Sequence, residues 1–130
     1  MSERAILRTP LGRAVGLGSA KEGVAHWWAQ RLTAVALVPL LLWFAAALIA
    51  HLGAPRAEAV AWLGSPLTSI TLVLLLLAGC YHMALGVQVV IEDYVHGEGT
   101  KLVALILNRF VAFILATAGI FAVLRIAVGG

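Results

Sequence analysis

The sequence predicts an all-α membrane protein that crosses the bilayer three times. Of its 130 residues, 62% are hydrophobic and only 12% are charged, which is far from the composition of soluble globular domains. A bilayer crossing takes about 20 apolar residues, so this length holds three spans and their connections. A large soluble catalytic domain is excluded. The single cysteine, Cys80, also excludes a disulfide framework and an all-cysteine metal site within the chain.

The three spans are expected at residues 32–51, 66–91 and 104–128. The first holds no charged residue, and its Pro39 can kink a membrane helix without breaking it. Ser65 before Pro66 is a good N-cap and first-turn pair for the second span. The third is interrupted by Arg109, whose guanidinium can snorkel toward the headgroups.

Residues 1–31 form a basic arm before the first span. The arm has no apolar core, so it is not a secretory signal. Seven of the nine Lys and Arg residues lie in the arm and the second connection, and two lie on the other side. The positive-inside rule therefore places the arm and the second connection in the cytoplasm or matrix. Because no polar domain gathers these cations for reading bases, the net charge of +3 predicts a lipid bilayer as the partner and no nucleic acid.

His82 is the most informative residue, because an unpaired imidazole inside a span is costly. It precedes Glu92 by ten residues, which places it roughly 15 Å from the inner interface. Gly79 and Gly86 lie on the same helical stripe as His82 and would leave a groove beside the imidazole. A flat macrocycle such as haem could approach the helix there, with His82 as a ligand of its iron. The alternative is a histidine bonded across a helix–helix contact, with the glycines serving close packing.

A haem iron bound to His82 would need its second axial histidine from another polypeptide. His51 ends the first span at the outer face, roughly 24 Å from the depth of His82. His26 and His96 lie outside the expected spans on the inner side. Arg31, at the inner mouth of the first span, is the best placed cation for haem propionates. Its alternative role is that of a snorkelling arginine that sets the topology.

Asp93 and Tyr94 close the second span at the inner interface. Steps of 100° per residue bring Asp93 within about 20° of the helical face of His82, so both can face the bundle interior. Tyr94 offers a phenol donor at the depth where a lipid-soluble quinone presents its carbonyl. The alternative is a tyrosine in the interfacial aromatic belt and two acids, Glu92 and Asp93, in a solvated loop.

Two stretches together resemble a known family. The string HMALGVQVVIEDYVHG, residues 82–97, is similar to the signature of the small hydrophobic anchor subunit of succinate dehydrogenase, respiratory complex II. The specific part is a histidine followed by glycine four residues later and by Asp-Tyr eleven and twelve residues later. The run GVAHWWAQRLTA, residues 23–34, resembles the entry of that subunit's first helix in alphaproteobacterial and mitochondrial-type enzymes. The resemblance covers residues 23–97.

This resemblance implies a three-helix anchor that forms half of a haem- and quinone-binding bundle. The other half would be a second hydrophobic anchor subunit of the cytochrome b556 type, and an iron–sulfur subunit and a flavoprotein subunit would complete the complex. It implies haem b with His82 as axial ligand of the iron, Arg31 near the propionates and quinone pocket, and ubiquinone bound by Tyr94 with Asp93 beside it. The chain would then be a non-catalytic subunit of succinate:ubiquinone oxidoreductase. Its expected location is the bacterial cytoplasmic (inner) membrane with a cytoplasmic N-terminus, or alternatively the mitochondrial inner membrane.

Two other functions compete with the anchor. A small stand-alone cytochrome b with two haems would carry electrons across the membrane, but it needs paired histidines at two depths, and only His82 is so placed. A structural subunit of a transporter would carry no pigment.

The cation count makes the topology testable by labelling with a membrane-impermeant thiol reagent. On a Cys80→Ser background, Ser19→Cys should react only after the membrane is opened, because the basic arm is expected on the inner side. Labelling of this cysteine from outside intact cells would refute the topology.

Overall fold

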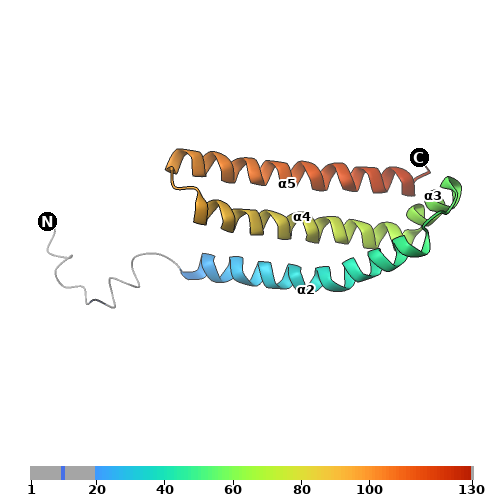
Figure 1. The fold of residues 1–130 in the computed structure, drawn as a ribbon, viewed down its shortest axis with the longest axis horizontal. Helices are drawn as coiled ribbons and strands as arrows, with labels where there is room; N and C mark the ends of the chain where they lie inside the picture. The colour runs from blue at the N-terminus through green and yellow to red at the C-terminus, as the bar shows by residue number, and fades with distance from the viewer. Residues whose placement is uncertain (1–9, 11–19, 130) are drawn as a thin grey trace.

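The computed structural model describes residue 10 and residues 20–129, and the latter fold into four α-helices. In chain order they are α2 (Ala20–Ala50), α3 (Arg56–Gly64), α4 (Pro66–Tyr94) and α5 (Glu98–Ala127). The three long helices lie side by side and alternate in direction, with α4 in the middle, and the short α3 caps the end where α2 stops and α4 starts (Figure 1). Ser19 and most of the basic arm lie outside the described residues.

The all-α prediction with three membrane spans is confirmed for residues 20–129. Three helical segments in this part of the chain are long and apolar enough to cross a membrane, namely Gly23–Ala50, Pro66–Tyr94 and Glu98–Ala127. The α2 helix begins well before the apolar stretch that starts at residue 32, because its first turns are rich in good helix formers such as alanine and glutamine. It continues through Pro39, as membrane helices allow.

The corner between α3 and α4 is fixed by hydroxyl groups. Ser65 occupies the N-cap position of α4, as the sequence predicts, but its side chain makes no capping bond. Its Oγ instead lies 2.8 Å from the carbonyl oxygen of Trp62 and 2.8 Å from Thr68 Oγ1. Ser69 Oγ donates to the carbonyl oxygen of Leu63 at 2.9 Å. These bonds satisfy two carbonyls at the end of α3, those of Trp62 and Leu63.

The helices form an open row rather than a closed bundle. Within the described residues α4 contacts both α2 and α5, whereas α2 and α5 do not contact each other. An amide bond supports the α4–α5 pair, because Asn108 Nδ2 donates to the carbonyl oxygen of Ala84 at 2.8 Å. The buried residues are few, and all but one belong to α4: Thr68, Ser69, Leu72, Ala84, Leu85 and Ala112. Most apolar surface is therefore left for lipid or for another protein.

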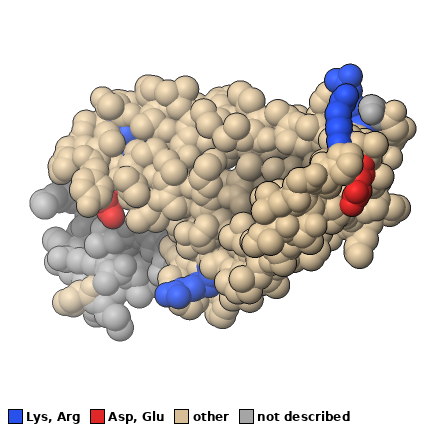
Figure 2. Space-filling model, turned by 45° about the vertical axis from the view of Figure 1, so that its right-hand side comes forward, with Lys and Arg blue, Asp and Glu red and all other residues tan. Residues whose placement is uncertain are grey.

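The exposed surface between the two ends is almost free of charge. Figure 2 shows one face on which the acidic and basic residues gather toward the ends and the middle is uncharged. Large apolar side chains are exposed along the spans, for example Val35 at 71% and Phe113 at 70% of their surface. Such exposure would be a liability in water, and in this chain it marks the hydrocarbon-facing zone.

Gly119 lies at a close contact between α4 and α5. A Cβ added at Gly119 would lie 2.9 Å from Leu76 Cδ2, closer than side chains approach one another. A Cβ added at Gly99, on the same helix, would have no atom within 4 Å. Small residues at one helix interface allow the close approach on which packing between membrane helices depends.

Replacing Gly119 by valine should force the Leu76 side chain to move and destabilise the α4–α5 pair by about 1–3 kcal/mol, as overpacking does. The measurement is the thermal midpoint of the purified complex. Gly99→Val is the matched control and should leave the midpoint unchanged or slightly raised, because valine has a higher helix propensity than glycine and a Cβ at Gly99 meets no atom within 4 Å. Equal midpoints for the two variants would show that Gly119 is not a spacing residue.

Candidate functional site

His82 points from α4 toward α2 and is hydrogen-bonded there. Its Nδ1 lies 2.9 Å from Oγ1 of Thr33, a contact between residues 49 positions apart in the chain. The imidazole is half-buried. Among the described residues, Nδ1 is the ring nitrogen that has a hydrogen-bond partner. Nε2 is not one of the buried atoms that lack a partner. The second nitrogen, Nε2, makes no hydrogen bond within the described residues.

The groove that the glycines were expected to leave beside His82 is filled by α2. A Cβ at Gly86 would lie 3.7 Å from Nε2 of Gln30, and one at Gly79 would lie 3.9 Å from Cδ2 of Leu37. Both distances are ordinary contacts, so the two glycines let α2 pack against α4. The interpretation of these glycines as the floor of a macrocycle groove is wrong, and the close-packing alternative holds for them.

The α2 side of this contact carries polar atoms that lack a partner. His26 Nε2 and Gln30 Oε1 are buried and make no hydrogen bond within the described residues. His26, Gln30 and Thr33 are spaced by four and three residues, so they form one stripe along the helix. The stripe begins near the start of α2, which places His26 inside a helix rather than in the arm expected before the first span.

Arg31 lies next to this stripe but is exposed. Its guanidinium carbon sits 5.3 Å from the centroid of the Trp27 ring, within the range of a cation–π contact. Trp27 in turn makes an edge-to-face contact with Trp28, with ring centroids 5.1 Å apart. Among the described residues no hydrogen bond joins Arg31 to an acid, so its charge stays available to an anionic group from outside the chain.

Asp93 and Tyr94 form the last turn of α4. Both are exposed, and Tyr94 keeps 76% of its surface accessible. The chain runs in opposite directions in α2 and α4, so the start of α2 and the end of α4 lie at the same end of the molecule (Figure 1). Arg31, His82, Asp93 and Tyr94 thus belong to two adjacent helices and the same half of the row, but within residues 20–129 no hydrogen bond links any two of them.

His51 and His96 are held by local contacts. His51 follows the end of α2, its Nδ1 lies 2.8 Å from the carbonyl oxygen of Ala47, and its ring stacks on Trp62 at 4.2 Å. His96 Nδ1 lies 3.0 Å from the carbonyl oxygen of Tyr94 in the turn after α4. In the described part of the chain no group of three or more His, Cys, Asp or Glu side chains is placed to hold a metal ion. Metal binding at His82 would need ligands from outside these residues.

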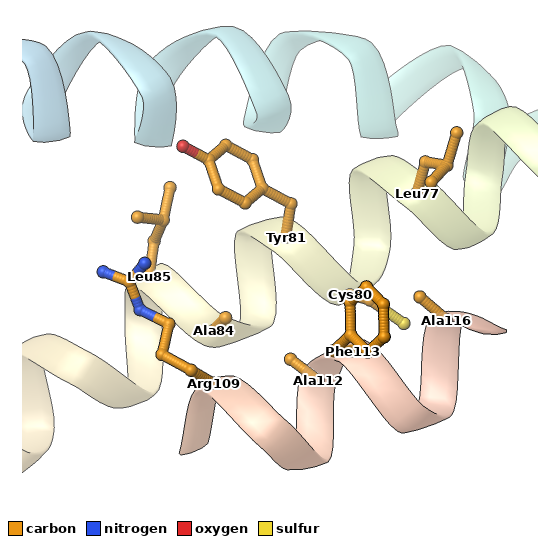
Figure 3. A pocket seen from close by; sticks show the side chains of 9 residues that line it. All are labelled: Leu77, Cys80, Tyr81, Ala84, Leu85, Arg109, Ala112, Phe113 and Ala116. Atoms are coloured by element: carbon orange, nitrogen blue, oxygen red, sulfur yellow. The ribbon is translucent and has the colours of Figure 1, made fainter. Parts of the chain in front are cut away.

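A separate groove of about 220 Å³ lies between α4 and α5. In Figure 3, Arg109 reaches from α5 to a position beside Leu85, and Tyr81 points away from α5. The remaining lining is apolar or small, from Leu77, Cys80, Ala84, Ala112, Phe113 and Ala116. None of the four predicted site residues lines this groove, so it is distinct from the face that carries His82.

Arg109 anchors a short chain of polar contacts near the same end of the row. Its Nη2 donates to Oε1 of Gln88 at 3.0 Å, and Nε2 of Gln88 donates to Oε1 of Glu92 at 2.8 Å. The guanidinium is thus bonded to a neighbouring helix, which the expectation of a snorkelling side chain did not include. The arrangement joins α5 to the last turns of α4, just before Asp93 and Tyr94.

Sequence reasoning missed Thr33, Gln30 and Gln88 as members of polar contacts. Each is polar within or beside an apolar stretch, and each lies three or four residues from another polar side chain. That spacing was the available signal. This spacing does not tell which neighbouring helix the side chain contacts. Only the three-dimensional structure gives that contact.

Known proteins with similar sequences are membrane subunits. The sequence family described as "Succinate dehydrogenase/Fumarate reductase transmembrane subunit" matches residues 6–116. The succinate dehydrogenase hydrophobic membrane anchor subunit of Paracoccus denitrificans is 32% identical over 121 residues, which are 93% of each chain. The protein of the same name from Rickettsia bellii (strain RML369-C) is 38% identical over 88 residues, 68% of this chain and 70% of the relative.

A third relative is the succinate dehydrogenase membrane anchor subunit of Reclinomonas americana. It is 34% identical over 99 residues, which cover 71% of this chain and 79% of the relative. No solved structure matches this chain significantly.

Proposed function

Because the chain belongs to the succinate dehydrogenase/fumarate reductase transmembrane subunit family, we propose that it holds haem b jointly with a partner and contributes to a ubiquinone site. Its coarser role follows from the family: it is a hydrophobic membrane anchor subunit of succinate dehydrogenase and not the catalytic subunit. It works in a membrane, within a complex that contains other subunits.

The observation that carries the haem proposal is the environment of His82. A histidine within a membrane span has one ring nitrogen bonded to Thr33 and the other left for a ligand. This fits an axial ligand, whose second nitrogen is ordinarily hydrogen-bonded by the protein. When bound, haem b supplies a one-electron carrier between the soluble subunits and the quinone. Arg31 has no acidic partner among the described residues and would pair with a propionate at the inner face.

The open row of helices supports a second hydrophobic anchor subunit as the direct partner. Since α2 and α5 do not touch within the described residues, α4 leaves long apolar faces uncovered on both sides of the row. A second subunit packed there would complete the bundle and provide the other axial histidine. In a bacterial inner membrane, the iron–sulfur and flavoprotein subunits would dock on the cytoplasmic side. The start of α2 and the end of α4 would lie on that side.

The ubiquinone proposal is supported by the end of α4. The Tyr94 hydroxyl is exposed at the interface depth of the span and makes no hydrogen bond within the described residues, so it can donate to a quinone carbonyl. Asp93 lies beside it in the same helical turn and is also exposed. The hydrogen bond from this hydroxyl becomes stronger as the quinone oxygen gains negative charge during reduction. It therefore stabilises the transition state for reduction more than it stabilises the bound quinone.

The stand-alone cytochrome b is less well supported. It needs a second histidine within the bundle, whereas His51 stacks on Trp62 beyond the end of α2 and His96 lies in a turn. Of the histidines in residues 20–129, His82 alone lies in the middle of a span.

Replacing His82 by alanine should remove or strongly perturb the b-type absorbance of the purified complex, because the iron would lose one axial ligand. The reduced-minus-oxidised visible spectrum is the measurement. His51→Ala is the control and should keep the wild-type spectrum. An unchanged spectrum and midpoint potential in the His82 variant would contradict the assignment of His82 as a haem ligand.

Replacing Tyr94 by phenylalanine keeps the ring and removes only the donor. If the hydrogen bond acts chiefly in the transition state, succinate:quinone activity should fall by about 10²–10³, or ~2.7–4 kcal/mol. Succinate:dye activity, with a soluble dye that takes electrons upstream, should survive, so the ratio of the two activities is the readout.

Tyr81→Phe is the matched control for this substitution. It removes a phenol from the same helix thirteen residues before Tyr94, where it lines the α4–α5 groove, and it should leave the activity ratio unchanged. A wild-type ratio in Tyr94→Phe membranes would make Tyr94 a belt residue and assign the quinone pocket to the other subunits.

A further inference from the structure

The hydroxyl of Thr33 stands in contact with three polar atoms but carries one proton. Two of them are carbonyl oxygens of its own helix, Ala29 at 2.7 Å and Gln30 at 3.1 Å, and the third is His82 Nδ1 at 2.9 Å. Carbonyl oxygens only accept, whereas a ring nitrogen can donate or accept. The shortest of the three contacts is the one to the carbonyl oxygen of Ala29, and if the hydroxyl proton goes there, His82 Nδ1 must donate its proton to the hydroxyl oxygen.

This assignment fixes the tautomer of His82. A neutral imidazole carries one N–H, and with that proton on Nδ1 the Nε2 nitrogen keeps its lone pair. An unprotonated nitrogen is what a metal ion requires of a histidine. The opposite direction of the bond would place the proton on Nε2 and leave no lone pair there for coordination.

The oxygen that accepts the Nδ1 proton is itself held firmly. Threonine is β-branched, and in a helix its side chain is restricted to two rotamers, one of which allows the bond to the preceding turn. Thr33 makes that bond to Ala29, so its remaining lone pairs face a fixed direction. The side chain is half-buried between two helices that also meet at Gly79 and Gly86, which limits access of competing water.

We propose that Thr33 is a positioning residue for His82: its hydroxyl accepts the Nδ1 proton and thereby holds the ring with an unprotonated Nε2 ready to bind the haem iron. The inference rests on the proposed function, since it takes His82 as an axial ligand. An acceptor on the Nδ1 proton also makes the imidazole a stronger electron donor. A stronger donor favours ferric over ferrous iron, so Thr33 lowers the midpoint potential of the bound haem.

The test compares Thr33→Val with Thr33→Ser in the purified complex. Valine keeps the shape of threonine without the acceptor, whereas serine keeps the hydroxyl. Thr117→Val is the matched control, because Thr117 also bonds to a carbonyl one turn earlier, Phe113 at 2.8 Å, but is exposed and contacts no histidine. The readouts are the haem content per complex and the midpoint potential of the b-type absorbance.

Thr33→Val should bind haem about tenfold less tightly, the usual effect of losing such a supporting bond. Its midpoint potential should rise; a tenfold change in the ferrous-to-ferric ratio corresponds to about 59 mV for one electron. Thr33→Ser and Thr117→Val should behave as wild type. A wild-type potential and haem content in Thr33→Val would overturn the inference, as would a shift in Thr33→Ser equal to that of Thr33→Val.

Two further variants keep the result decisive. If Thr33→Val complex does not accumulate, Thr33→Ala is measured against the same criteria. His82→Ala is measured in parallel: an unchanged spectrum there refutes the haem proposal itself, whereas loss of the spectrum there with a wild-type Thr33→Val refutes only the positioning role.

Discussion

The hydrocarbon core of a membrane offers no water to a polar group, and this constraint governs the arrangement of the helices. Helices satisfy their own backbone groups, and Thr71 and Thr117 satisfy their hydroxyls on carbonyls one turn earlier. An imidazole cannot be satisfied in this way when it points off its helix. The bond from His82 to Thr33 therefore requires α2 and α4 to be adjacent at that level, and the glycines on α4 allow the close approach that the bond needs.

The same constraint explains why the row of helices is incomplete by itself. His26 Nε2 and Gln30 Oε1 are buried without partners in the described residues, and each such atom costs about 1–3 kcal/mol. The spans also bury little of their own apolar surface, because α2 and α5 stay apart. Both properties fit the proposal that a second subunit packs against this row of helices. The stability of this chain is expected to depend on the rest of the complex, as in obligate assemblies.

Sequence reasoning reached the helices and the candidate residues but not their contacts. Long apolar runs without charge predict spans, and the Ser65 and Pro66 pair predicts the start of α4, because these signals are local. Gly79 and Gly86 were misread as a groove because a glycine stripe indicates close approach without identifying what approaches, and here it is α2. Thr33 was missed for the same reason: its partner lies 49 residues away, and no spacing rule within one helix connects the two.

The proposed roles of His82 and Tyr94 depend on α4 being a single unbroken helix. Twelve residues separate them, so the rise of 1.5 Å per residue sets their axial distance at roughly 18 Å. Arg109 joins α5 to this segment through Gln88, which in turn bonds Glu92 one turn further on. Under the proposed function, a non-catalytic subunit would therefore matter to electron transfer by geometry alone, because one helix would hold the proposed iron ligand and the proposed quinone donor at a fixed separation. A break in α4 between the two would alter that separation without removing either side chain.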